Sequence, residues 1–339
     1  MHRRSLLAAP LLLLAPRLGL AQAEPPPESS APPALSAVLD RAGGLEPLRT
    51  VIVAKDGETL AARGFEGGRV DRPTNIKSAS KSVLAILAGI AIDKGVLEGP
   101  EQKIAPLLKA DLPDDPDPRL YEITLGNLLS MQAGLERTSG AYYGAWIASP
   151  NWVRAALARP FVDAPGGQML YSTGSSHLVS AILTRASGRS TLALARDWLG
   201  PIEGFDIADW EQDRQGIYFG GNQMAMRPTS LLAFAECCRN EGRNRAGQQV
   251  IPPDWIAQCW QARTQSRFTG DAYGYGWFTR EIDGARAHYG WGYGGQMLYV
   301  VPERDVSLVM TSTTVAPSGR TGHRDDLHAL AGEMLAALR

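Results

Sequence analysis

The sequence is poor in the residues that build disulfide-bonded and metal-bound scaffolds. Its 339 residues include three cysteines and five histidines. Cys237 and Cys238 are adjacent and Cys259 is the third, so this odd set predicts no disulfide framework. No Cys-x-x-Cys pair, His-Glu-x-x-His helix or phosphate-loop glycine pattern occurs. These residues therefore support neither a metal site nor a nucleotide site, and we expect no cofactor.

The sequence also lacks an excess of charge of either sign. Its formal net charge is -1 at pH 7. A chain balanced in this way has no broad field for attracting nucleic acid or acidic lipid. Hydrophobic residues make up 44% of the chain, which is typical of an ordinary folded enzyme. We therefore expect no nucleic-acid partner.

A long apolar run is missing too, because the first one is short and follows basic residues. The run from Leu6 to Leu14 comes after Arg3 and Arg4, and Ala21-Gln22-Ala23 fits a small-residue cleavage site. Residues 1–23 therefore predict a signal peptide and an exported, periplasmic protein. The paired arginines before leucines fit the twin-arginine route, although the general export route stays open.

A membrane anchor is the alternative for this segment, and the sequence argues against it. Pro10, Pro16 and Arg17 interrupt an apolar stretch that is already shorter than the ~20 residues needed to span a bilayer. We expect no stable membrane anchor. Residues 24–33 are rich in proline and serine and predict an exposed linker, so the folded domain is expected over residues 34–339.

Apolar patterning predicts strands near both ends of the chain and helices between them. The runs 50–54 and 59–63 flank an Asp-Gly turn and predict a hairpin. Residues 78–94 predict a helix with a broad buried face that Gly95 can end. Further helices are expected over 124–131, 152–158, 176–186, 191–198, 229–240 and 325–338, and strands over 276–282, 285–289, 296–301 and 306–312.

This order of elements favours an α+β fold. Its antiparallel sheet would be built from residues 34–99 and 263–339 and flanked by helices. A mainly helical subdomain over residues 100–262 would be inserted between the two parts of the sheet.

Ser78-Ala79-Ser80-Lys81 is the one Ser-x-x-Lys in a chain with six lysines, and it lies where a helix is predicted to begin. Residues three apart share a helical face, so the Lys81 amine can approach the Ser78 hydroxyl. A partly desolvated lysine can accept the proton of a serine nucleophile. Alternatively, Ser78 caps the helix and Lys81 is solvated, and the four residues alone do not exclude this.

The wider sequence resembles the serine β-lactamases and penicillin-binding proteins, whose first motif is matched by Lys77 to Val83. Leu170-Tyr171-Ser172-Thr173-Gly174 resembles the Tyr-x-Asn element of their class C and esterase branches. The resemblance implies a β-lactamase/transpeptidase-like fold and a catalytic group of Ser78, Lys81 and Tyr171. Tyr171 would be the partner base, with its pKa lowered by Lys81. Thr173 replaces the usual asparagine beside the lysine.

The third element that the resemblance implies is glycine-rich here. Trp291-Gly292-Tyr293-Gly294-Gly295-Gln296 stands where the lactam-recognising branches carry Lys-Thr-Gly, and it holds no cation for a substrate carboxylate. Gly292 permits a close backbone approach, so the N–H of Tyr293 is expected to join that of Ser78 in an oxyanion hole.

This glycine-rich stretch, followed by Val-x-Pro, is most similar to the branch of 6-aminohexanoate-dimer hydrolases and related esterases. Ile123 to Leu135 and Tyr273 to Trp277 also match this branch, and the resemblance spans Leu48 to Ala336. It implies an ester, amide or peptide-like small-molecule substrate. A β-lactamase, a D-alanyl peptidase and a non-catalytic sensor or binding module remain the alternatives.

Two further features are left open or interpreted as structural. The loop Tyr142-Tyr143-Gly144-Ala145-Trp146 either contributes aromatic surface to an acyl pocket or holds itself to the helical region. No Gly-x-Ser-x-Gly elbow occurs, so His177 and His288 are interpreted as structural rather than as members of a Ser-His-Asp triad.

Overall fold

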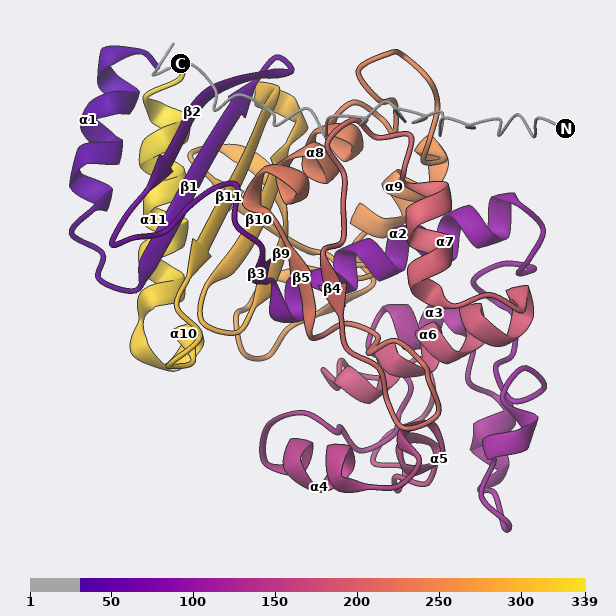
Figure 1. The fold of residues 1–339 in the computed structure, drawn as a ribbon. Coiled ribbons are helices and arrows are strands. Elements are labelled where there is room, and N and C mark those ends of the chain that lie inside the picture. The colour runs from indigo at the N-terminus through magenta and orange to yellow at the C-terminus, as the bar shows by residue number, and fades with distance from the viewer. Residues whose placement is uncertain (1–30) are drawn as a thin grey trace, which may run out of the picture.

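One antiparallel sheet joins the two ends of the chain (Figure 1). The computed structural model describes residues 31–339. The strand order of the large sheet is β2-β1-β11-β10-β9-β8-β7-β6. Its strands are β1 Leu48–Lys55, β2 Glu58–Gly64, β6 Thr264–Gln265, β7 Ala272–Tyr273, β8 Phe278–Ile282, β9 Ala285–Gly292, β10 Gln296–Val301 and β11 Val306–Ser312. The predicted α+β class is confirmed.

Helices cover both faces of this sheet and fill the middle of the chain. They are α1 Pro33–Ala42, α2 Ser80–Asp93, α3 Leu125–Leu129, α4 Tyr143–Ala148, α5 Trp152–Leu157, α6 Thr173–Ser187, α7 Thr191–Trp198, α8 Pro228–Arg239, α9 Pro253–Trp260, α10 Ser318–Thr321 and α11 His323–Ala336. Figure 1 shows α1 and α11 on one face of the sheet, with α2 and α8 toward the other.

The side chains of β10 show how the sheet divides two hydrophobic cores. Met297, Tyr299 and Val301 belong to the core with α1 and α11, whereas Leu298 and Val300 belong to the core with α2 and α8. Successive side chains of a strand point to opposite faces. Both faces are covered, so Met297 to Val301 do not alternate with charged or strongly polar residues.

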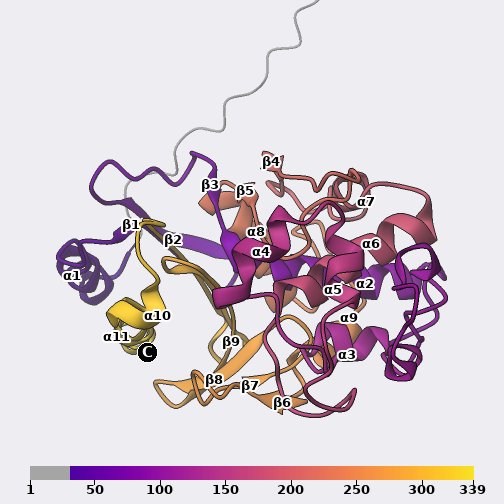
Figure 2. The same cartoon turned by 90° about the horizontal axis from the view of Figure 1, so that it is seen from below.

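The middle of the chain is mainly helical and lies beside the sheet, as Figure 2 shows from below. It also contributes to a second, three-stranded sheet in the order β3-β5-β4. These strands are β3 Thr74–Asn75, β4 Asp209–Trp210 and β5 Met224–Met226. They were not predicted, because two or three residues are too few to show a period of two.

Several predicted elements match closely, and the differences have local causes. The expected strand 276–282 begins only at Phe278, because Gly276 adopts a φ of 75° before it. The expected helix 176–186 starts three residues earlier, at Thr173. Helices α4 and α9 were not predicted. The subdomain boundaries proposed at residues 99/100 and 262/263 stay a prediction.

The predictions for the N-terminus fall mostly outside the described part of the chain. The signal peptide, residues 1–23, and residues 24–30 of the linker lie outside residues 31–339. Pro33, the last residue of the predicted linker, already belongs to α1. Within residues 31–339, no helix is long and apolar enough to cross a membrane.

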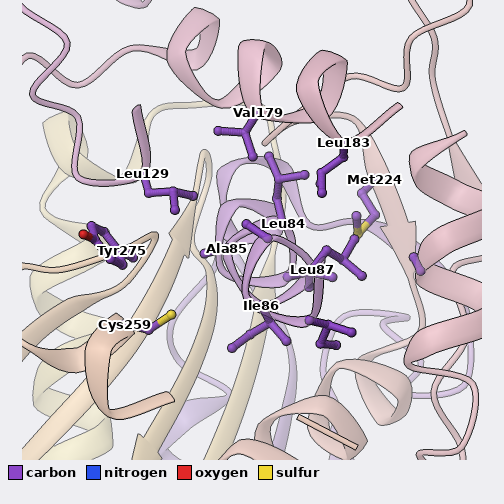
Figure 3. Close-up of a cluster of buried hydrophobic side chains, with 14 of the residues drawn as sticks. Leu84, Ala85, Ile86, Leu87, Leu129, Val179, Leu183, Met224, Cys259 and Tyr275 are labelled. Atoms are coloured by element: carbon purple, nitrogen blue, oxygen red, sulfur yellow. The ribbon is translucent and has the colours of Figure 1, made fainter. Parts of the chain in front are cut away.

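Helix α2 is buried along almost its whole length between the sheet and the helical region (Figure 3). Every residue from Ser80 to Ala91 is buried. Gly89 allows α9 to pack closely, because a Cβ there would lie 2.0 Å from Cδ1 of Trp255. The Trp255 indole N–H donates to the Ala85 carbonyl at 2.8 Å. This packing fixes the helix that follows Ser78.

We expect Gly89→Ala to lower the free energy of unfolding by about 1–3 kcal/mol, because overpacking a rigid contact is destabilising. Gly144→Ala is the matched control, since Gly144 is also helical and has nothing within 4 Å of its added Cβ. Alanine there should be neutral or stabilise by about 1 kcal/mol. Urea unfolding of both variants measures the difference, and equal stabilities would contradict the packing argument.

Candidate active site

Ser78 lies in a single 3-10 turn, Lys77–Ala79, directly before α2. Lys77 has a φ of 51°, a left-handed conformation that costs a residue with a Cβ about 1 kcal/mol or more. The Asn75 side-chain oxygen accepts a hydrogen bond from the Lys77 N–H at 3.0 Å and helps to hold this bend. Neither this turn nor α2 has a side-chain cap. The capping alternative for Ser78 is therefore not what the structure shows.

Gly292, at the end of β9, brings the sheet against this bend. A Cβ at Gly292 would lie 2.2 Å from the Ile76 carbonyl oxygen and 3.0 Å from the Lys77 Cβ. Only glycine fits such an approach of backbone to backbone. The structure therefore places the predicted glycine-rich stretch beside the predicted nucleophile.

Lys81 contacts three oxygen atoms with its amine. Its Nζ lies 3.0 Å from Ser78 Oγ, 3.4 Å from Thr173 Oγ1 and 2.7 Å from the Gly221 carbonyl oxygen. The first two contacts agree with the sequence-based grouping. Gly221 was missed, because any residue can present a backbone carbonyl and the sequence carries no signal for it.

Burial changes the protonation of this amine. Lys81 is 3% exposed, and desolvation lowers its pKa to about 7. The wall beside it is mostly apolar, with Leu84, Leu128 and Val179 among the residues that line a cavity of about 10 Å³. Such a space holds one water at most. A large fraction of Lys81 is therefore uncharged near neutral pH and can accept a proton.

Tyr171 completes the predicted group, but with a pKa opposite to the one expected. Burial raises the pKa of its phenol to about 12, and a hydrogen bond with Ser78 offsets part of that effect. Lys81 Nζ lies 5.0 Å from the centroid of the Tyr171 ring. The expectation that Lys81 lowers the Tyr171 pKa was wrong, because burial dominates. Near pH 7 the phenol is a proton donor.

The Thr173 hydroxyl, which contacts Lys81, is held by Ser139, a residue that the sequence did not predict for this site. Thr173 Oγ1 lies 3.0 Å from Ser139 Oγ, which also accepts a hydrogen bond from the Thr173 N–H at 2.9 Å. Thr173 is the first residue of α6, and Ser139 comes from the loop before α4. Two hydroxyls thus occupy the region where the resemblance led us to expect one amide.

Tyr293 lies in the turn between β9 and β10 and is 46% exposed. Its carbonyl accepts a hydrogen bond from the Gln296 side chain at 3.4 Å. The turn is tight, since Gly294 and Gly295 both have positive φ. The oxyanion role of the Tyr293 and Ser78 N–H groups stays a prediction.

The remaining reactive groups are distributed as follows. All three cysteines are free and buried. Within residues 31–339 no group of three His, Cys, Asp or Glu residues is arranged to hold a metal ion.

Of the aromatic loop Tyr142 to Trp146, Trp146 is buried at 4% exposure while Tyr142 is 39% exposed. Tyr143 and Trp146 both pack against Phe219 and hold α4 to the helical region, which favours the structural interpretation for those two residues.

Comparisons with known proteins show the family to which this chain belongs. The Beta-lactamase family model matches residues 40–333, so the chain belongs to the Beta-lactamase family. No curated protein matches the sequence. Membership of this family supports a hydrolase of the serine type in general terms.

Solved structures share the fold at low identity. One is a Bacillus anthracis protein to which 6-aminohexanoate-dimer hydrolase activity is attributed, with 18% identity, a TM-score of 0.71, and coverage of 87% of this chain and 81% of that chain. EstCE1, a hydrolase with promiscuous acyltransferase activity, has 18% identity, a TM-score of 0.70 and coverage of 90% and 97%. A penicillin-binding protein homologue from Caulobacter crescentus has 20% identity, a TM-score of 0.69 and coverage of 91% and 98%.

We expect the rate at which a fluorophosphonate labels Ser78 to depend on the protonation of Lys81. Because burial lowers the Lys81 pKa to about 7, the rate should fall about tenfold per pH unit below that value and level off above it. Lys81→Arg stays charged and should abolish rapid labelling. A wild-type rate that keeps rising to pH 10 would instead indicate an ordinary lysine.

Gly292→Ala should slow the same labelling reaction on the order of 10²-fold, because its Cβ would displace the backbone before Ser78. Gly319→Ala is a suitable control on the neighbouring segment, where the added Cβ would meet only the edge of the Trp291 ring at 2.9 Å. The labelling rates of the two variants are compared with that of wild type, with circular dichroism to confirm that both variants fold. Unchanged labelling of the Gly292 variant would contradict the role of this approach.

Proposed function

We propose that this protein hydrolyses a small-molecule ester or amide through an acyl-serine intermediate on Ser78. The observation that carries the proposal is the 3.0 Å contact between Lys81 Nζ and Ser78 Oγ, together with the lowered pKa of that amine. A serine hydroxyl becomes an effective nucleophile when a neighbouring base takes its proton.

Acylation then follows from the protonation states of the two partners. The neutral Lys81 amine accepts the Ser78 proton while Oγ bonds to the substrate carbonyl carbon. The N–H groups of Ser78 and Tyr293 are assigned to the resulting oxyanion. Tyr171 donates its phenol proton to the leaving group and is reprotonated from Lys81, consistent with a Tyr171 pKa near 12.

Deacylation repeats these transfers with water in place of the serine. The neutral Lys81 amine removes a proton from the attacking water, the bond between Ser78 Oγ and the acyl carbon breaks, and the Lys81 ammonium returns the proton to Oγ. The chemistry requires no cofactor and no metal ion. Ser78, Lys81 and Tyr171 are the catalytic residues of this proposal, and Thr173 orients the amine.

An ester or amide is favoured over a β-lactam as substrate. The stretch Trp291 to Gln296 holds no lysine or arginine, so it lacks the cation that binds a lactam carboxylate in related enzymes. A β-lactamase or D-alanyl peptidase remains the second candidate, favoured by the family match. A non-catalytic sensor is disfavoured, because Ser78, Lys81 and Tyr171 lie within reach of one another.

We further propose that the protein acts in the periplasm after removal of residues 1–23. Their basic start, short apolar run and small-residue end support export. A small substrate is consistent with this location.

A substrate panel tests the function directly. We expect turnover of nitrophenyl esters or an aminohexanoate dimer to exceed that of nitrocefin and a D-alanyl peptide, and Ser78→Ala to lower it by at least about 10³-fold. Mass spectrometry should find the acyl group on Ser78 in wild-type protein. Efficient nitrocefin turnover with negligible ester cleavage would favour the second candidate, and undiminished activity of Ser78→Ala would exclude this nucleophile.

A further inference from the structure

A fully buried histidine–carboxylate pair lies behind the active site. His177 on α6 and Asp213, between β4 and β5, both have side chains with 0% exposure. His177 Nε2 lies 2.9 Å from Asp213 Oδ2. His177 was interpreted from the sequence as structural, and the Ser78 mechanism does not use it. Burying the Asp213 carboxylate costs free energy, which the hydrogen bond with His177 offsets.

The hydrogen bonds around the pair fix its protonation. Asp213 Oδ1 accepts from the Gln215 and Ile217 N–H groups at 2.8 and 2.9 Å. His177 Nδ1 accepts from the Gly220 N–H at 3.3 Å. A nitrogen that accepts carries no proton, so His177 is neutral and its Nε2–H donates to the carboxylate. The hydrogen bond to Asp213 therefore keeps the proton on Nε2 and leaves Nδ1 able to accept the Gly220 N–H.

Gly220 belongs to the loop that also holds Lys81. The next residue, Gly221, accepts the 2.7 Å hydrogen bond from Lys81 Nζ. This loop is tightly fitted, because a Cβ at Gly220 would lie 2.3 Å from the Ser176 carbonyl oxygen and one at Gly221 would lie 2.6 Å from Lys81 Cγ. A shift of the loop away from His177 would therefore move the carbonyl that contacts the amine.

The Gly221 carbonyl controls the direction of the lysine lone pair. A neutral amine has two N–H donors and one lone pair. Gly221 O and Thr173 Oγ1 are placed to take the two donors. The lone pair is then directed toward Ser78 Oγ, at 3.0 Å. Without Gly221 the amine is free to rotate an N–H toward the serine, and it cannot accept a proton in that orientation.

Aromatic rings isolate the pair from water. Trp146, Trp152 and Phe219 surround His177 with ring centroids 5.8, 5.4 and 5.9 Å away. A hydrogen bond is electrostatically stronger in such a dry environment. The Trp146 indole N–H itself donates to the Trp152 carbonyl at 2.9 Å, which closes the enclosure.

We propose that His177 and Asp213 are positioning residues for the reaction, which hold the Gly220-Gly221 loop so that the Lys81 amine presents its lone pair to Ser78. The proposal rests on the proposed function of the Ser78–Lys81 group. Neither residue touches the substrate or the reacting atoms. Their effect passes through Gly220 N–H and Gly221 O.

Asp213→Asn is the sharpest variant, because it changes the tautomer with almost no change in shape. The amide oxygen is needed at the Oδ1 position by two backbone N–H groups, so the NH₂ faces His177 Nε2. That nitrogen must then accept, which places the proton on Nδ1 opposite the Gly220 N–H. Two donors cannot hydrogen-bond each other, and the loop is released.

The readout is the pH profile of Ser78 labelling by a fluorophosphonate. Asp213→Asn and His177→Leu should lower the plateau rate on the order of 10²-fold and move the midpoint to higher pH, since a loosened loop admits water to Lys81. Tyr171 is the titratable group that faces Lys81, and burial alone accounts for the lowered Lys81 pKa. His177→Gln, which keeps one donor and one acceptor, should remain within a few-fold of wild type.

His328→Leu is the matched control. His328 is also a buried histidine, with a hydrogen bond between its Nδ1 and the Tyr299 hydroxyl at 3.0 Å, but it belongs to α11 on the opposite face of the sheet. It should lose stability without moving the rate or the midpoint. Wild-type rate and midpoint in folded Asp213→Asn and His177→Leu would overturn the proposal.

Nitrogen-15 NMR of the His177 imidazole in wild-type protein tests the proposal without a variant that could fail to fold. We expect an unprotonated Nδ1, a protonated Nε2 and a Gly220 amide that exchanges slowly with solvent. A protonated Nδ1 would overturn the proposal. If wild-type protein is not labelled, or if Ser78→Ala is labelled equally, the proposed function is rejected. The NMR result would then still test separately whether His177 holds the Gly220 N–H.

Discussion

The site depends on an amine that is almost removed from water and yet fully hydrogen-bonded. Lys81 is 3% exposed and contacts Ser78, Thr173 and Gly221. Desolvation makes the neutral amine accessible near pH 7, and the oxygen contacts fix its orientation. Both conditions require α2 to be enclosed, which explains why this helix runs between the sheet and the helical region instead of over the surface.

The contact between Ser78 and Lys81 was predictable, because it is encoded locally. Ser78 and Lys81 are three residues apart at the start of a helix, a spacing that reads directly from the sequence. Gly221 and Ser139 were not predictable, because they meet Lys81 and Thr173 through long-range folding and use a carbonyl and a common hydroxyl. The pKa of Tyr171 was predicted with the wrong sign, since its burial depends on Tyr273 and Phe278 packing around it.

Among the elements of the fold, long apolar segments were predicted well and short ones were not. β10, β11 and α7 have the predicted bounds, because each has a clear hydrophobic pattern and a turn signal at its ends. β3, β4 and β5 are held by pairing with one another and carry no pattern of their own. The three-stranded sheet nevertheless matters to the site, because β3 leads into the strained Lys77 bend and β5 follows the Gly221 loop.

The pairing of β1 with β11 joins Thr50 to Thr311 and Val51 to Met310 across nearly the whole sequence. During synthesis the N-terminal hairpin is therefore complete long before its partner strand exists. Until β11 is synthesised, one edge of β1 keeps unpaired backbone groups beside an apolar face. A newly made chain is thus open to association with other chains over this interval, and the sheet is completed only once β6 to β11 have been synthesised.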